Sequence, residues 1–120
     1  MRDYPKKIKR MLREYKIEAY EIELHRELTK LEKSFEKWKN GTISNGEFSY
    51  RIHQYEKGPS RELFKKYNYG EDAINVAYAI VTGLLDREKI PVEFLEEIEG
   101  ALSFFQSMKD RGELKEPGED

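Results

Sequence analysis

The sequence predicts an all-α fold, a bundle of five helices in a single domain. Three observations lead to this prediction. Apolar residues recur every three to four positions along most of the chain, which is the period of an amphipathic helix. The breaks in that pattern coincide with glycine and proline, and no stretch alternates apolar and polar residues as a half-buried strand does. A chain of 120 residues is also long enough for one sizeable core.

The first predicted helix is unusually long. Pro5 suits a first helical turn, and no helix-breaking residue follows before Asn40-Gly41, so the helix would span about 50 Å. Its apolar residues form two stripes, and the register slips by two residues between them, which is about 200° of rotation. The first stripe is Ile8, Leu12, Tyr15, Ala19 and Ile22, and the second is Ile17, Tyr20, Leu24, Leu28, Leu31, Phe35 and Trp38. We therefore expect the helix to pack on two sides or to change partner midway, and a second copy of the chain is the obvious candidate for the extra side.

The next two predicted helices form one bent return along the first. Ser44 and Glu47 have the spacing of a capping box, in which side chains satisfy the free amide groups of a helix start. Helix two then runs to about Lys57. Gly58-Pro59 ends it and begins helix three, because proline fits a first turn. Helix three ends near residues 68–70.

The fourth predicted helix covers about residues 72–86. It is apolar nearly all round, so we expect it to be central and buried. Asn75 and Thr82 lie within it, and each would need a hydrogen-bond partner once buried.

The fifth predicted helix is amphipathic, begins at Pro91 and runs to about Arg111, where Gly112 stops it. Phe94 widens its main apolar stripe, which is Val92, Leu95, Ile98, Leu102 and Phe105. We assign residues 1–111 to one helical domain and expect the polar tail, residues 112–120, to be disordered.

Composition excludes several classes of function. The chain has no cysteine, so disulfides, thiolate zinc sites and thiol nucleophiles are excluded. The N-terminus has no signal-peptide pattern, and the longest apolar stretch has 13 residues, whereas a membrane span needs ~20. We therefore expect a cytoplasmic protein with no membrane partner. The abundance of Glu (19) and Lys (14) over Gln (2) is typical of thermophile proteins, which concerns origin and not function.

The charge is divided unevenly along the chain. Residues 1–40 carry a net charge of +4, residues 41–70 one of +2 and residues 71–120 one of −8. Opposite charges of this size attract, so we expect the basic and acidic blocks to meet within one fold or between two copies.

The two histidines offer a weak case for a metal. Glu21 precedes His25 by four residues and Glu56 follows His53 by three, so each pair lies on one helix face. Acidic residues make up a fifth of the chain, and such spacings arise by chance in roughly a third of sequences of this kind. The sequence therefore predicts no metal and no other cofactor. A small enzyme or metal-binding bundle using His25 and His53 remains the second alternative.

A polar cluster is expected at the bend between helices two and three. The bend would bring two helix ends together, and the side chains there could contact a ligand or partner, or form ion pairs that hold the bend. No evident nucleophile accompanies them, so we assign no catalytic residue. The candidate contact residues are Arg51, His53, Glu56, Arg61 and Glu62.

The basic start of the first helix supports the first alternative, a nucleic-acid-binding accessory protein. Cations neutralise phosphates, and nearby tyrosines can stack on bases. A sequence pI near 5.8 argues against this function. The candidate residues are Lys6, Lys7, Lys9, Arg10 and Arg13.

The hypothesis that the sequence favours is a helical protein-interaction module without catalytic activity, forming a homo-oligomer and most simply a dimer. It follows from the overlong first helix with two stripes, the divided charge and the missing catalytic groups. The alternative to a second copy of the chain is a different protein partner. The sequence identifies no biological process.

Overall fold

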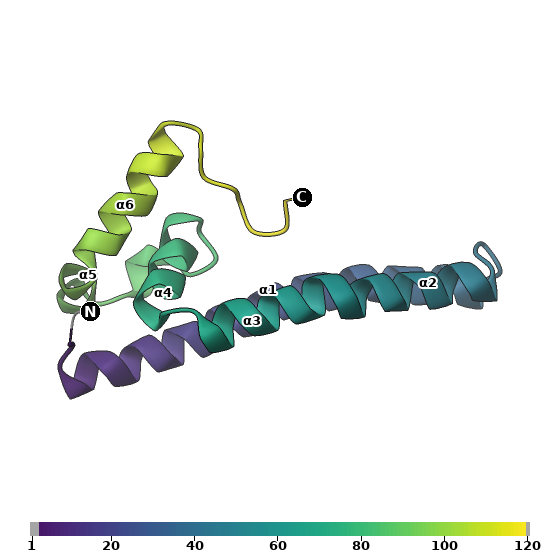
Figure 1. The fold of residues 1–120 in the computed structure, drawn as a ribbon, viewed down its shortest axis with the longest axis horizontal. Helices are drawn as coiled ribbons and strands as arrows, with labels where there is room; N and C mark the ends of the chain where they lie inside the picture. Colours follow the sequence, from purple (N-terminus) through teal and green to yellow (C-terminus); the bar gives the residue numbers. More distant parts are fainter. Residues whose placement is uncertain (1–2, 120) are drawn as a thin grey trace.

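The computed structural model describes residues 3–119 and confirms the all-α prediction, with no strand in that range (Figure 1). A π-helical turn, Glu56–Ser60, joins α2 to α3, and a 3-10 turn, Arg87–Lys89, precedes α5. The helices are α1 (Lys6–Lys39), α2 (Asn45–Tyr55), α3 (Arg61–Tyr69), α4 (Asp72–Val81), α5 (Val92–Glu97) and α6 (Glu99–Asp110). The molecule is elongated, with extents of 53 × 32 × 25 Å. None of the helices within residues 3–119 combines the length and the apolar character needed to cross a membrane.

A long helical hairpin forms the backbone of the molecule (Figure 1). One arm is α1, an unbroken helix of 34 residues. The other arm, which we call the return segment, is α2, the π turn and α3, and each of these three packs against α1, as predicted. The predicted cap is also present, because Ser44 Oγ accepts a hydrogen bond from the Glu47 amide at 3.0 Å. At the tip, the rings of Phe35, Trp38 and Phe48 lie 5.4–5.6 Å apart and hold the two arms together.

The return segment stays helical through Gly58-Pro59, where the sequence predicted that one helix ends and the next begins. Proline has no N–H to donate and its ring crowds the preceding turn, which breaks ordinary α-helical bonding. The backbone adopts one wider π turn here, in which each hydrogen bond joins residues five apart and not four apart as in an α-helix. The extra residue shifts the helical phase, so α2 and α3 both keep contact with α1.

The helix α4 lies at the centre of the core, as predicted, between α1 and α6. Val76, Ala77 and Ala79 are fully buried. Asn75 is buried too, and its side chain donates a hydrogen bond to the Lys66 carbonyl at 2.8 Å. Thr82 Oγ1 donates to the Tyr78 carbonyl at 2.7 Å, so both expected partners are present.

Two further helix boundaries differ from the prediction. α4 ends at Val81, because Gly83 takes the left-handed conformation (φ +83°) that terminates helices. The predicted fifth helix is interrupted at Ile98 and becomes α5 and α6. The expected apolar stripe is therefore wrong at its start: Val92 is 67% exposed, and Phe94 is fully buried instead.

The tail turns back from α6 toward the hairpin (Figure 1). Leu114 packs against the core, and Tyr78 Oη donates a hydrogen bond to the Lys115 carbonyl at 2.5 Å. Further along, Gly118 and Glu119 line a pocket together with Glu27 of α1. Disorder of the tail stays a prediction, as does the assignment of residues 1–111 to one domain.

Candidate functional site: the two faces of the hairpin

One face of the hairpin, which we call the polar face, carries charged side chains from both arms. Two adjoining pockets of about 220 and 240 Å³ lie along it. The tail covers part of the first pocket, since Gly118 and Glu119 belong to its wall. The charged and hydroxyl side chains along the two pockets include Glu23, Glu27, Lys30 and Ser34 from α1 and Arg51, Glu62 and Lys66 from the return segment.

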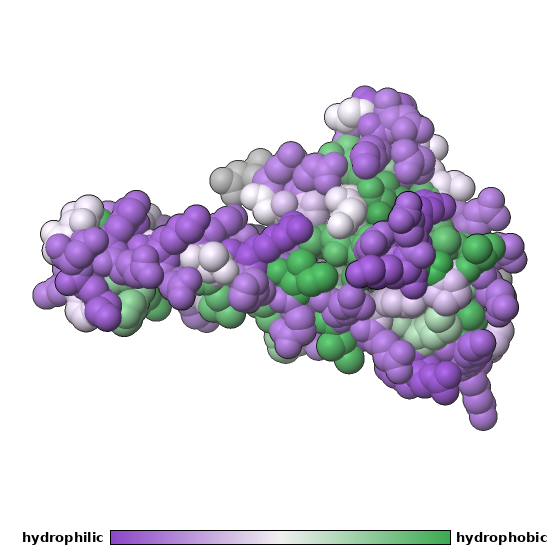
Figure 2. All heavy atoms as spheres, turned by 180° about the vertical axis from the view of Figure 1, so that it is seen from behind, coloured by the Kyte–Doolittle hydropathy of each residue, from purple (hydrophilic) through white to green (hydrophobic). Residues whose placement is uncertain are grey.

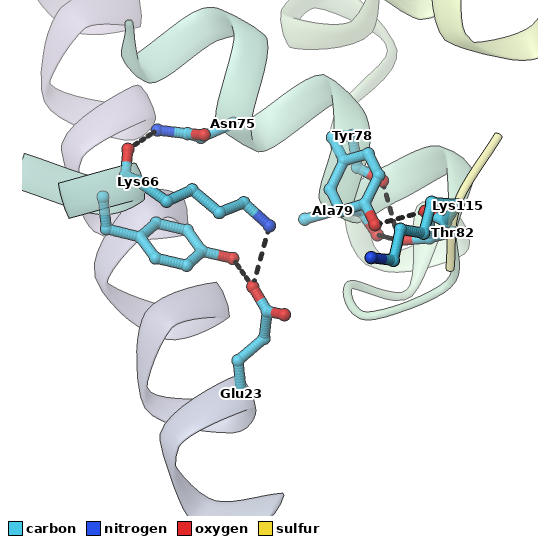
Figure 3. Close-up of polar contacts among 8 residues, drawn as sticks. Glu23, Lys66, Asn75, Tyr78, Ala79, Thr82 and Lys115 are labelled. Carbon is cyan, nitrogen blue, oxygen red and sulfur yellow. Dashed lines mark hydrogen bonds and ion pairs between the residues drawn. The ribbon is translucent and has the colours of Figure 1, made fainter. Parts of the chain in front are cut away.

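A buried carboxylate is the centre of the polar face. The side chain of Glu23 is only 7% exposed. Tyr67 donates a hydrogen bond to Glu23 Oε2, and Lys66 Nζ lies 3.0 Å from the same oxygen (Figure 3). Lys66 Nζ also lies 4.2 Å from the centre of the Tyr78 ring. A buried charge is tolerated only when it is paired, and the ammonium and the hydroxyl supply that pairing.

The electrostatics of this cluster keep both tyrosines protonated. Burial raises the pKa of Tyr67 far above its usual value of 10, and the hydrogen bond to Glu23 adds to the effect. Burial, followed by the charge of Glu23, raises the pKa of Tyr78 to about 12. Both hydroxyls therefore remain hydrogen-bond donors at neutral pH. Every buried side-chain nitrogen and oxygen within residues 3–119 has a hydrogen-bond partner, so a clamp between α1, α3 and α4 accounts for the cluster.

The sequence pattern did not predict this cluster. A signal was present, because Glu23 follows Ala19 by four residues and so interrupts the buried stripe of α1 with a carboxylate. A polar residue in such a register needs a buried partner. Nothing in the local pattern indicates that Lys66 and Tyr67, more than 40 residues away, supply it.

The opposite face of the hairpin carries exposed apolar side chains, and charged residues such as Glu21 and Arg26 lie beside them. Leu28 lies about 100° around α1 from its neighbour Glu27, and Ile52 lies about 100° around α2 from its neighbour Arg51. Glu27 and Arg51 line the polar pockets. We define the apolar face as Ile17, Leu24, Leu28 and Phe35 of α1 with Ile52 and Phe64 of the return segment. Leu24 is half-buried and the other five are 44–57% exposed. Figure 2 shows hydrophobic side chains in patches along the lower edge of the hairpin, on the side away from α6.

The predicted polar cluster at the bend is divided between separate contacts. Arg51 Nε pairs with Glu47 at 3.3 Å, and its guanidinium also donates to Ser34 Oγ of α1 at 3.1 Å. Arg61 Nε pairs with Glu56 across the π turn at 3.0 Å. The structure thus brings Arg61 and Glu56 together but directs Arg51 elsewhere. A role in ligand or partner contact stays a prediction for these residues.

The remaining members of the predicted sites lie apart from one another. Glu62 lines the first polar pocket, whereas His53 is exposed. His25 and Glu21 are exposed on α1 and border a shallow groove there. Within residues 3–119, no three side chains of the types that bind metals come close enough to hold an ion. The structure therefore does not assemble Glu21, His25, His53 and Glu56.

The basic start of α1 is exposed except for the apolar side chains it carries. Lys9 Nζ pairs with Asp3 at 2.7 Å. One turn beyond the cluster, Lys16 Nζ lies 3.2 Å from Asp72 of α4, where the basic and acidic blocks of the chain meet. The exposed cations are Lys6, Lys7, Lys9, Arg10 and Arg13. Contact of these residues with nucleic acid stays a prediction.

Comparison of the chain with models of protein families, with curated proteins and with solved structures finds no match. The structural class of this protein is therefore described from its own helices. It is an all-α protein in which a compact unit of three helices, α4 to α6, covers one part of a long helical hairpin, and the hairpin has one polar and one apolar face.

Proposed function

We propose that this protein is a non-catalytic helical interaction module, located in the cytoplasm, that forms a homo-oligomer through the apolar face of its hairpin. A dimer is the simplest form. One observation supports the proposal above the others: five large apolar side chains, about half exposed, lie on one face of the hairpin. Single apolar residues are scattered over the surface of any protein, whereas several that gather on one face often belong to an interaction site.

The exposed area has the size that a dimer requires. A large apolar side chain has roughly 200 Å² of surface, so five that are half exposed leave roughly 500 Å² per copy. A standard interface takes about 800 Å² from each partner, and about two thirds of it is apolar in homodimers. A second copy of the chain therefore matches the apolar face in area, and a partner of different chemistry is not needed.

The test is the mass of the protein in solution. We expect light scattering at about 100 μM to give twice the chain mass of 14.3 kDa. Leu28→Glu should weaken the dimer at least about a hundredfold, because it places a carboxylate in the apolar face of each copy. The matched control is Thr29→Glu, which adds the same charge to the neighbouring position 100° away and should leave the dimer intact.

Two results would contradict the proposal. A wild-type protein that stays strictly monomeric at this concentration would remove the homo-oligomer. A Leu28→Glu variant with the wild-type dissociation constant would show that the apolar face is not the interface. Circular dichroism of each variant confirms that the helices are retained.

A further inference from the structure

We infer that the second copy binds antiparallel, with α1 of one copy packed along α1 of the other. This inference rests on the proposed function, since it assumes that the apolar face is the dimer interface. Two hairpins that meet face to face have two twofold arrangements. In one, the symmetry axis crosses the hairpins, and α1 packs on α1 of the partner in the opposite direction. In the other, the axis runs along the hairpins, and α1 packs on the partner's return segment.

The spacing of the apolar residues on α1 favours the first arrangement. Ile17, Leu24, Leu28 and Phe35 are separated by seven, four and seven residues, so the pattern reads the same in both directions. A twofold axis at position 26 places Ile17 opposite Phe35 of the partner subunit and Leu24 opposite Leu28 of the partner subunit. In the second arrangement, these four side chains would meet only Ile52 and Phe64, which are twelve residues apart.

The position of the basic cluster favours the same arrangement. Its five cations lie near the N-terminus of α1 and are exposed. The antiparallel arrangement places the two clusters at opposite ends of the dimer. The second arrangement would hold both clusters at one end, where like charges repel. The units formed by α4 to α6 lie on the other side of each hairpin, so they do not obstruct the pairing of the apolar faces.

The antiparallel arrangement also brings specific charges together. Lys39 of one copy lies beside Glu14 of the partner subunit, which is attractive. Glu21 lies beside Glu32 of the partner subunit, which is repulsive and occurs twice by symmetry. All four side chains are exposed in the single chain. The repulsive pair distinguishes the two arrangements, because the second arrangement does not bring Glu21 near Glu32 of the partner subunit.

Cysteine crosslinking tests the orientation directly. The chain has no cysteine, so each introduced thiol is the one available for disulfide formation. Ile17→Cys and Phe35→Cys proteins are mixed and mildly oxidised, and we expect a disulfide between positions 17 and 35, identified by peptide mass. Each variant alone should not crosslink, because identical positions would lie about 27 Å apart along the bundle. The second arrangement instead predicts a disulfide in a mixture of Phe35→Cys and Ile52→Cys proteins.

A gain in affinity provides an independent test. Glu21→Lys converts the two repulsive pairs into attractive ones and should lower the dissociation constant roughly tenfold at low salt. Glu88→Lys is the control: it makes the same charge change at an exposed site between α4 and α5, and we expect less than a twofold effect.

The outcomes separate the inference from the proposed function. A disulfide between positions 17 and 35, with tighter association of Glu21→Lys, supports the antiparallel dimer. A disulfide between positions 35 and 52 overturns the antiparallel orientation but agrees with a dimer that forms through the apolar face. A dimer that forms neither disulfide overturns the orientation and the choice of face. A wild-type protein that is monomeric throughout overturns the inference and the proposed function together.

Discussion

Lys66→Met should destabilise the fold through the loss of a single charge. Lys66 Nζ lies 3.0 Å from Glu23 Oε2, and the Glu23 side chain is 7% exposed. Methionine keeps most of the length of the alkyl stem, but it removes the ammonium, which lies 5.0 and 4.2 Å from the centres of the Tyr67 and Tyr78 rings. Glu23 then keeps its hydrogen bond from Tyr67 and loses its counter-ion.

The size of the effect follows from how far the pair is buried. Removing one partner of a fully buried ion pair costs about 3–5 kcal/mol. The Lys66 side chain is 29% exposed, so water screens part of the interaction, and the Tyr67 hydroxyl still satisfies the carboxylate. The lost contact between the ammonium and the Tyr78 ring adds about 0.5–1 kcal/mol. We therefore expect a loss of about 2 kcal/mol, or roughly 6–10 °C in Tm.

The measurement is urea unfolding followed by circular dichroism at pH 7. It is made at one fixed protein concentration, because an oligomer's apparent stability depends on concentration. Lys65→Met is the control, since Lys65 is the exposed neighbour on α3 and should change stability by less than about 0.5 kcal/mol. If the two variants lost the same free energy, the buried pair would not be the clamp described here.

Two further predictions concern the same core. The pKa values of Tyr67 and Tyr78 are raised above 10, so the stabilisation they provide is complete below pH 10 and is lost as the pH rises toward about 12, where Tyr78 ionises in the folded state. Unfolding free energy should fall there by up to about 1.4 kcal/mol per pH unit for each tyrosine, and a Tyr67→Phe protein whose slope matched wild type would refute this. Phe94→Ala should cost about 3–5 kcal/mol in urea unfolding, whereas Val92→Ala should cost less than about 0.5 kcal/mol. Equal costs would contradict the burial of Phe94.

Local chemistry made most of the helix boundaries predictable from the sequence. The capping residues at Ser44 and Glu47 act within four positions, and so does the proline at position 59. The length of α1 was predictable for the same reason, since no residue within it breaks a helix. Local sequence signals were less decisive where two backbone conformations have similar free energies. Gly58-Pro59 could end a helix or be accommodated in a π turn, and the contacts of both α2 and α3 with α1 favour the π turn.

The candidate site depended on contacts that no local pattern encodes. The pairing of Glu23 with Lys66 and Tyr67 joins residues 43 and 44 positions apart, so it required the hairpin to be in place. The apolar stripe of α5 failed for a related reason. The helix is interrupted at Ile98, and in the short α5 the expected core residue Val92 is exposed, whereas Phe94, expected only to widen the stripe, is fully buried. The cluster expected near Gly58-Pro59 likewise divides, because Arg61 pairs with Glu56 whereas Arg51 contacts Ser34 on α1.

The distribution of apolar residues supports an interaction function more strongly than their number does. Single exposed apolar residues are normal on any protein surface, and if chance alone placed them, both faces of the hairpin would carry them equally. Along the same length of α1, the polar face presents Glu27, Lys30 and Ser34 to its pockets, while Leu28 and Phe35 lie on the other side. A hairpin of two helices buries only the sides that face each other, so the first stripe of α1 is covered by α4 and the outer part of the second stripe has no layer above it. The proposal that another polypeptide supplies a third layer on that side rests on this one-sided distribution of apolar residues.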